Sequence, residues 1–103
     1  MDLRTHKTRR SIINAFLQLR SKKAVEKISV KELSALAEIN KATFYLHFHD
    51  IYDLSETLER DVVRSCMNGI QHHEDVFRDT RRFIKEMSDS LAANEQLIKL
   101  LFE

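Results

Sequence analysis

The sequence of 103 residues contains no proline, no tryptophan, one glycine and one cysteine. Hairpins and tight β connections depend on proline and glycine, so an all-β fold is disfavoured. The single cysteine, Cys66, can form neither an intramolecular disulfide nor a cysteine-based zinc site. No apolar run resembles a signal peptide or is long enough to cross a bilayer. We therefore expect a cytoplasmic protein without a membrane partner.

What the sequence does contain favours helices. Hydrophobic residues make up 43% and charged residues 32% of the chain, which is typical of a folded globular protein. Alanine, leucine, glutamate, lysine, arginine and glutamine are abundant, and these residues lose little conformational freedom in a helix. The sequence therefore predicts an all-α fold.

The net charge of +1 conceals a difference between the two halves of the chain. Residues 1–49 carry ten Lys and Arg against four Asp and Glu, whereas residues 50–103 carry seven against twelve. A basic first half suggests that one end of the protein meets a polyanion. Ordinary charged surface is the competing interpretation, and the asymmetry alone does not decide between them. We expect a DNA-binding domain over 1–49 and a linking and regulatory region over 50–103.

The apolar pattern predicts a first helix over residues 4–20, with Ile12, Ala15, Phe16 and Leu19 on its buried face. Basic residues come before this stripe. We interpret Arg4, Lys7 and Arg9 as a basic arm that follows the DNA backbone or enters the minor groove. Flexible, solvated charge is the competing interpretation.

Residues 29–48 predict two short capped helices. Ser29 and Glu32 form a capping box, in which each side chain binds the backbone amide of the other residue. The helix that follows ends near residue 37 and buries Val30, Leu33 and Leu36 or Ala37. After a break of three residues, Asn40 is placed to cap a helix over 41–48.

The second half predicts three more helices. Asp50 caps a long helix, which ends where Asn68 and Gly69 tolerate a left-handed backbone. A polar connection at 72–75 precedes a fifth helix, and Asn94 caps a sixth. The apolar face expected for the long helix consists of Ile51, Leu54, Leu58, Val62 and Cys66, with Val63, Met67 and Ile70 beside them. The apolar face expected for the fifth helix consists of Phe77, Ile84, Met87 and Leu91, with Val76 and Phe83 alongside.

Two short helices separated by a three-residue break are typical of a helix-turn-helix, which places its second helix in the major groove of DNA. Residues at the start of that helix must be small or able to hydrogen-bond, so that the backbone can approach the duplex. Asn40, Lys41, Ala42 and Thr43 meet this requirement. Many all-α domains contain similar corners, so the spacing alone is a moderate signal.

The residue pattern is more specific than the spacing. Residues 28–54 read ISVKELSALAEINKATFYLHFHDIYDL, with Ser29-Val30 opening one helix and the run from Thr43 to Phe48 inside the next. This stretch resembles the DNA-binding region of the TetR family of bacterial transcriptional regulators, where the corresponding segments are Thr-Val and Val-Ser-Lys-Gly-Thr-Phe-Tyr. The resemblance covers roughly residues 5–55.

The resemblance implies a three-helix DNA-binding bundle, a long linking helix and a C-terminal helical domain that binds a small effector and forms a dimer. The chain departs from the family at Glu38, which replaces the turn glycine, at Ser34, which replaces an alanine, and at Ile51, which replaces a frequent lysine. Only two helices follow the linking helix, so we expect a truncated C-terminal bundle with an incomplete or absent effector pocket.

The outward side of helix 41–48 supplies the candidate base contacts Lys41, Ala42 and Leu46. Lys41 can donate to guanine O6 and N7, and Ala42 or Leu46 can touch a thymine methyl group. The remaining candidates are expected to contact phosphates: Ser29, Thr43, Tyr45 and His47, with Arg4 and Lys7 on the arm. The alternative roles for these residues are capping, core packing or solvated surface.

These residues predict a dimeric repressor that binds a palindromic operator in double-stranded DNA. The alternative is a truncated helical module that binds or dimerises with protein and does not read DNA, which the apolar stretch 97–102 favours. An enzyme is the weakest hypothesis, because no glycine-rich phosphate loop, paired metal ligands or activated nucleophile occurs. We expect neither a cofactor nor a metal ion.

Overall fold

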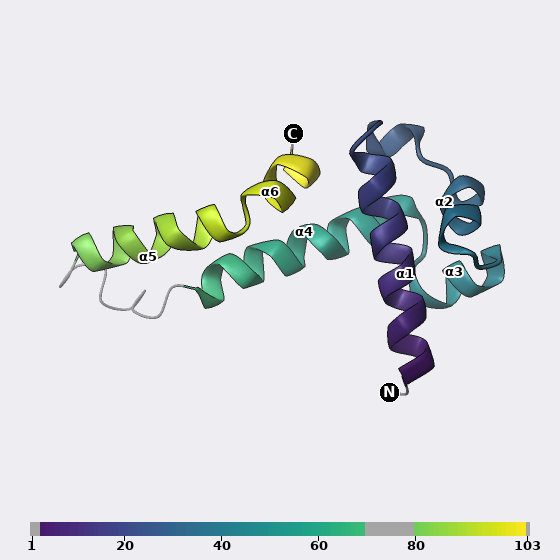
Figure 1. Cartoon of the computed structure of the whole chain (residues 1–103), viewed down its shortest axis with the longest axis horizontal. Helices are drawn as coiled ribbons and strands as arrows, with labels where there is room; N and C mark the ends of the chain where they lie inside the picture. The colour runs from purple at the N-terminus through teal and green to yellow at the C-terminus, as the bar shows by residue number, and fades with distance from the viewer. Residues whose placement is uncertain (1–2, 70–79, 103) are drawn as a thin grey trace. The chain divides into compact units, whose positions relative to one another are not determined.

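The computed structural model describes residues 3–69 and 80–102, and these residues are all-α, as the composition predicts (Figure 1). No strand occurs in these two ranges, and none of their helices combines the length and apolar character needed to cross a membrane. The elements in chain order are α1 (Leu3–Arg20), a 3₁₀ turn (Val25–Lys27), α2 (Val30–Ala37), α3 (Lys41–His47), α4 (Ile51–Asn68), α5 (Thr80–Ala93) and α6 (Glu95–Phe102).

The chain divides into two compact units, Met1–Thr57 and Leu58–Glu103. We call them the N-terminal unit and the C-terminal unit. Helix α4 begins in the first and ends in the second. The domain boundary expected after residue 49 lies just before α4, and it stays a prediction.

The core of the N-terminal unit is built from helices α1 to α3 and the first turns of α4. The apolar stripe predicted for α1 is buried, and α1 contacts α2, which in turn contacts α3. Ile28, which precedes α2, also belongs to this core. The largest fully buried side chains all lie in this unit: Ile12, Phe16, Leu33, Phe44 and Leu54.

Helix α2 begins as predicted, but only half of the capping box forms. The Ser29 hydroxyl accepts a hydrogen bond from the Glu32 amide at 3.0 Å. The Glu32 carboxylate does not return to Ser29, because both of its oxygens accept from Lys23 Nζ at 2.7 Å. The charged partner is the stronger donor, so the cap is replaced by an ion pair that ties residue 23 to α2.

The next two helix starts are capped as predicted. Asn40 Oδ1 accepts from the Thr43 amide at 2.8 Å, and Asp50 Oδ1 accepts from the Asp53 amide at 2.7 Å. Asp53 Oδ2 also accepts from the His49 amide at 2.8 Å, which closes the corner between α3 and α4. Helix α3 ends one residue earlier than expected, because Phe48 has an extended backbone.

The turn between α2 and α3 places Glu38 in the left-handed region, with φ 60° and ψ 44°. This is the conformation for which the family pattern has glycine. The Ile39 amide donates to the Ser34 carbonyl at 3.0 Å across the turn. Ser34 itself is buried, and its hydroxyl has no hydrogen-bond partner. Val30 and Ala37 are half-buried and Leu36 is exposed, so the predicted packing of α2 holds fully only for Leu33.

In the C-terminal unit, α4 ends at Asn68 as predicted, but Gly69 does not have the role that we expected. Gly69 has no positive φ, so the left-handed ending that we expected is wrong. A Cβ atom at Gly69 would instead lie 2.5 Å from Ser90 Oγ and 2.9 Å from Ser90 Cβ. The Ser90 hydroxyl donates to the Cys66 carbonyl at 2.6 Å. Glycine is therefore required by the close approach of α5.

The predicted buried face of α5 is wrong. Ile84, Met87 and Leu91 are 50%, 37% and 47% exposed, and the buried residue of this helix is Ser90. Although the Asn94 carbonyl accepts a hydrogen bond from the Ile98 amide at 2.9 Å, the Asn94 side chain does not cap α6. Its side-chain amide donates to the Ser90 carbonyl at 2.8 Å and completes the end of α5.

The main stripe predicted on α4 is covered, but the row beside it is not. Ile51, Leu54, Leu58 and Val62 are buried and Cys66 is half-buried, whereas Val63 and Met67 are about half exposed. The predicted positions of Ile70, Val76 and Phe77 and the polar connection at 72–75 lie outside the described residues.

Candidate nucleic-acid interface

Helix α3 has one buried side and one exposed side. Phe44 is completely buried and Phe48, which follows the helix, is 3% exposed. On the other side, Lys41 and Ala42 are exposed, Tyr45 is 54% exposed and Leu46 is 84% exposed. The residues that we expected to face outward therefore do so.

The burial of Phe44 sets the rotation of α3, and two aromatic rings of the same segment contact it. The Phe44 and Tyr45 rings are nearly perpendicular, with centroids 5.3 Å apart, and the Phe48 ring lies 5.9 Å from that of Phe44. Tyr45 is therefore held by its ring, while its hydroxyl, which makes no hydrogen bond with the described residues, is left for another partner. A core role for Tyr45 does not agree with its exposure.

The basic residues before the apolar stripe do not form an extended arm. Arg4 and Lys7 lie in α1, which begins at Leu3, and they are exposed on the same side of the helix because they are three residues apart. The segment contains no proline or glycine to interrupt the helix, which begins as early as Leu3. The contact of these residues with the DNA backbone or the minor groove stays a prediction.

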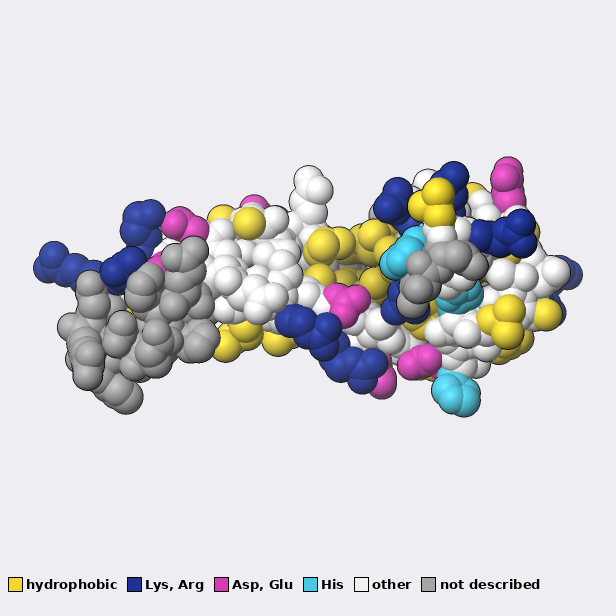
Figure 2. All heavy atoms as spheres, turned by 90° about the horizontal axis from the view of Figure 1, so that it is seen from below, with side chains coloured by type: hydrophobic (Ala, Val, Ile, Leu, Met, Phe, Trp, Pro, Cys, Tyr) yellow, Lys and Arg dark blue, Asp and Glu magenta, His cyan; other side chains and the backbone are white. Residues whose placement is uncertain are grey.

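Arg9 has a structural role in addition to its charge. Its guanidinium lies over the Phe48 ring, 4.7 Å from the centroid, and its side chain is half-buried. This contact ties α1 to the end of α3. In Figure 2, which is seen from the side on which α1 begins, Lys, Arg and His side chains gather over the N-terminal unit.

The two hydroxyls predicted at phosphates differ in what they can still do. Ser29 Oγ accepts from the Glu32 amide, so its own hydrogen is left to donate to a phosphate. Thr43 Oγ1 donates to Asn40 Oδ1 at 2.9 Å, so it must leave this partner before it can donate to a phosphate. His47 is half-buried at the end of α3, with its ring 6.3 Å from that of Phe48.

A shallow hollow of about 220 Å³ lies beside the outward side of α3. Sequence reasoning did not include His49 here, although it follows His47 and Phe48 directly. The His49 side chain is exposed and lines the hollow, and its amide is bound by Asp53. The residues around the hollow are Tyr45, Leu46, His47, Phe48, His49 and Asp53.

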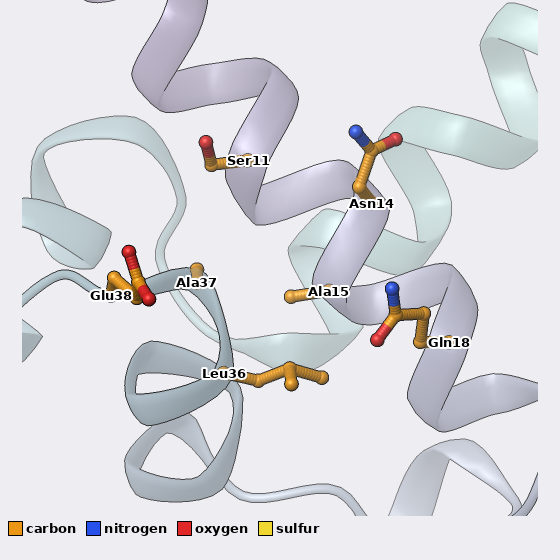
Figure 3. A pocket seen from close by; sticks show the side chains of 7 residues that line it. All are labelled: Ser11, Asn14, Ala15, Gln18, Leu36, Ala37 and Glu38. Atoms are coloured by element: carbon orange, nitrogen blue, oxygen red, sulfur yellow. The ribbon is translucent and has the colours of Figure 1, made fainter.

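A second hollow of about 260 Å³ lies between α1 and the end of α2 (Figure 3). Helix α1 faces it with the polar or small side chains of Ser11, Asn14, Ala15 and Gln18. These side chains do not cover Leu36, which explains why Leu36 is exposed although its spacing predicts burial. None of the candidate contact residues lines this hollow.

Two further findings bear on function. Within residues 3–69 and 80–102, no group of three or more His, Cys, Asp or Glu side chains could hold a metal ion. No protein-family model, curated protein or solved structure matches the chain.

Proposed function

We propose that this protein is a sequence-specific DNA-binding transcriptional regulator, most simply a repressor of the TetR type, which reads the major groove with α3. The observation that carries the proposal is the two-sided character of this helix. Phe44 anchors it in the core, while Lys41, Ala42, Tyr45 and Leu46 project away from the core of the basic half of the chain.

The exposed groups fit the chemistry of a duplex. A lysine ammonium can donate to guanine O6 and N7 in the major groove, and apolar side chains can contact thymine methyl groups. Hydroxyl and imidazole groups at Ser29, Tyr45 and His47 are suited to phosphate oxygens, which position a protein on DNA without reading its sequence. Arg4 and Lys7 add positive charge from α1.

The family resemblance adds a second copy and a symmetric site to this proposal. In a dimer that binds a palindromic operator, the two recognition helices must reach successive major grooves, about 34–36 Å apart. The C-terminal unit is the candidate for the dimer contact.

The proposal is tested by selecting bound duplexes from a random DNA pool and measuring the mass of the complex in solution. We expect a palindromic site and two protein chains per site. Lys41→Ala should then lower the affinity for this site by roughly tenfold or more, because a good base contact contributes about 1–3 kcal/mol. Tyr45→Ala should also lower the affinity, because it removes a phosphate contact. Their melting temperatures should stay close to that of the unmodified protein.

Lys22→Ala is the matched control, because Lys22 is also exposed in the N-terminal unit but lies outside α3. It should change the affinity for the selected site less than Lys41→Ala does. Failure to select any sequence would contradict the proposal. Unfolding of Tyr45→Ala would show that Tyr45 stabilises the core and does not serve as a DNA contact.

A protein-interaction module is the second candidate, and the exposed apolar side chains of Ile84, Met87 and Leu91 favour it. The two functions differ in their response to salt. Binding to DNA must weaken as salt rises, because neutralised phosphates release counterions. A protein that dimerises but shows no salt-dependent affinity for DNA would support the second candidate.

A further inference from the structure

The outward side of α3 combines one charged group with two apolar ones. Leu46 is 84% exposed, the largest exposed fraction among the exposed large hydrophobic residues of the described chain. Ala42 lies four residues before it and is also exposed, so the two share one side of the helix. Neither side chain has a hydrogen-bonding atom, so Leu46 and Ala42 can recognise only an apolar group.

The major groove of DNA offers one such group, the 5-methyl of a pyrimidine. We propose that Leu46 recognises a pyrimidine 5-methyl group in the bound site. This inference rests on the proposed DNA-binding function and names what the same helix reads. Because leucine cannot distinguish the O4 acceptor of thymine from the N4 donor of cytosine, it reads the methyl group and not the base. Thymine and 5-methylcytosine should therefore both be accepted where Leu46 lies.

The surroundings of Leu46 favour DNA over an apolar protein partner. Its neighbours on the outward side are Lys41, with its full charge, and Tyr45, whose exposed hydroxyl is free to donate. His47 and His49 border the hollow beside it. A protein-docking face needs a contiguous apolar patch, whereas a single apolar side chain among donors suits a groove with acceptors and isolated methyl groups.

The position of Ala42 extends the inference along the site. Four residues of α-helix advance by about 6 Å, which is close to two steps of stacked bases at about 3.4 Å each. Ala42 can therefore approach a second methyl group within about two base pairs of the first. Its short side chain requires closer approach, so Leu46 should provide most of the discrimination.

The test uses the full chain and the duplex selected from the random pool. Each thymine of the site is replaced in turn by deoxyuridine, which removes only the 5-methyl group. At one position in each half-site we expect the affinity to fall about fourfold, the factor that corresponds to burial of one methyl group. At that position, 5-methylcytosine should bind more tightly than cytosine by a similar factor.

Leu46→Ala should abolish both differences, so that thymine and deoxyuridine are bound equally, while Leu46→Met should retain them. Leu36→Ala is the matched control, because Leu36 is also an exposed leucine of the N-terminal unit but lies on α2. It should leave the methyl discrimination unchanged, and circular dichroism is to be used to check that each variant folds.

The two proposals fail in distinguishable ways. If no duplex is selected, the DNA-binding function is wrong and this inference is lost with it. If a site is selected but deoxyuridine binds as tightly as thymine at every position, the protein reads DNA and the inference about Leu46 is overturned. If discrimination persists in Leu46→Ala, another side chain reads the methyl group, and the inference is again wrong.

Discussion

The N-terminal and C-terminal units carry similar helical patterns of apolar residues but cover them differently. In the N-terminal unit the stripe of α1 is buried, and Phe16, Leu33 and Phe44 are completely inaccessible. In the C-terminal unit the stripe of α5 is about half exposed, and the buried residue of that helix is Ser90. Periodicity therefore shows which side of a helix is apolar, but not whether a partner covers that side.

The exposed residues of the two units also differ in kind. On α3 the exposed positions combine Lys41, Tyr45 and Leu46, whereas on α5 the exposed apolar positions are Ile84, Met87 and Leu91, which recur at helical spacing. The first set suits a polar partner with isolated apolar groups, and the second suits another apolar surface. The contrast agrees with a DNA-reading N-terminal unit and a protein-contacting C-terminal unit.

The largest expected effect is on the free energy of unfolding, and it distinguishes a buried apolar residue from an exposed one. Phe44→Ala removes a completely buried ring and should lower the free energy of unfolding of the N-terminal unit by about 3–5 kcal/mol. Leu91→Ala should change stability by less than about 0.5 kcal/mol, because its side chain is already half exposed. Both tyrosines, Tyr45 and Tyr52, lie in the N-terminal unit, so tyrosine fluorescence during urea unfolding measures the effect of Phe44→Ala. Circular dichroism, which also follows the helices of the C-terminal unit, measures the effect of Leu91→Ala. Equal effects of the two substitutions would contradict the comparison.

The next effect tests how closely α5 packs in the C-terminal unit. Gly69→Ala places a Cβ atom 2.5 Å from Ser90 Oγ and should destabilise this contact by about 1–3 kcal/mol. In a Ser90→Gly background the same substitution should cost much less, because both nearby Ser90 atoms are gone. Thermal unfolding followed by circular dichroism measures the coupling between the two positions. Additive effects would show that α5 moves away freely, and the close packing would be refuted.

Local signals in the sequence were sufficient for the helices and for the rotation of α3. The caps at Ser29, Asn40 and Asp50 involve residues that are three apart in the sequence. They can therefore be predicted without knowledge of the tertiary structure. The apolar spacing around Phe44 similarly placed Lys41 and Leu46 on the outer side.

What the sequence did not reveal depends on residues that are distant in the chain. The Arg9 contact with Phe48 and the ion pair of Lys23 with Glu32 join different segments. The close approach of Ser90 to Gly69 does the same. Gly69 is needed for this close contact, and from the sequence alone it could not be distinguished from a glycine needed for a turn. No local pattern specifies such contacts.

A smaller effect concerns a buried polar group in the core of the N-terminal unit. Ser34 is buried and its hydroxyl has no hydrogen-bond partner, which costs on the order of 1 kcal/mol or more. Ser34→Ala removes that group and should raise the free energy of unfolding by about 1 kcal/mol beyond the gain in helix propensity. Ser11→Ala, on the exposed side of α1, measures the gain in propensity alone. If the two substitutions stabilise equally in urea unfolding, the hydroxyl is not desolvated.

The smallest effect concerns the left-handed residue between α2 and α3. A side chain at Glu38 costs about 1 kcal/mol or more in this conformation, whereas glycine adopts it freely. Glycine also gains freedom in the unfolded chain, so Glu38→Gly should stabilise the N-terminal unit by only about 0.5 kcal/mol. Glu38→Ala keeps the Cβ atom and removes the charge, so it should give no such gain. If alanine stabilises as much as glycine in tyrosine-monitored unfolding, the penalty comes from the carboxylate. If glycine alone stabilises, the chain tolerates backbone strain at the turn that sets the angle between α2 and α3.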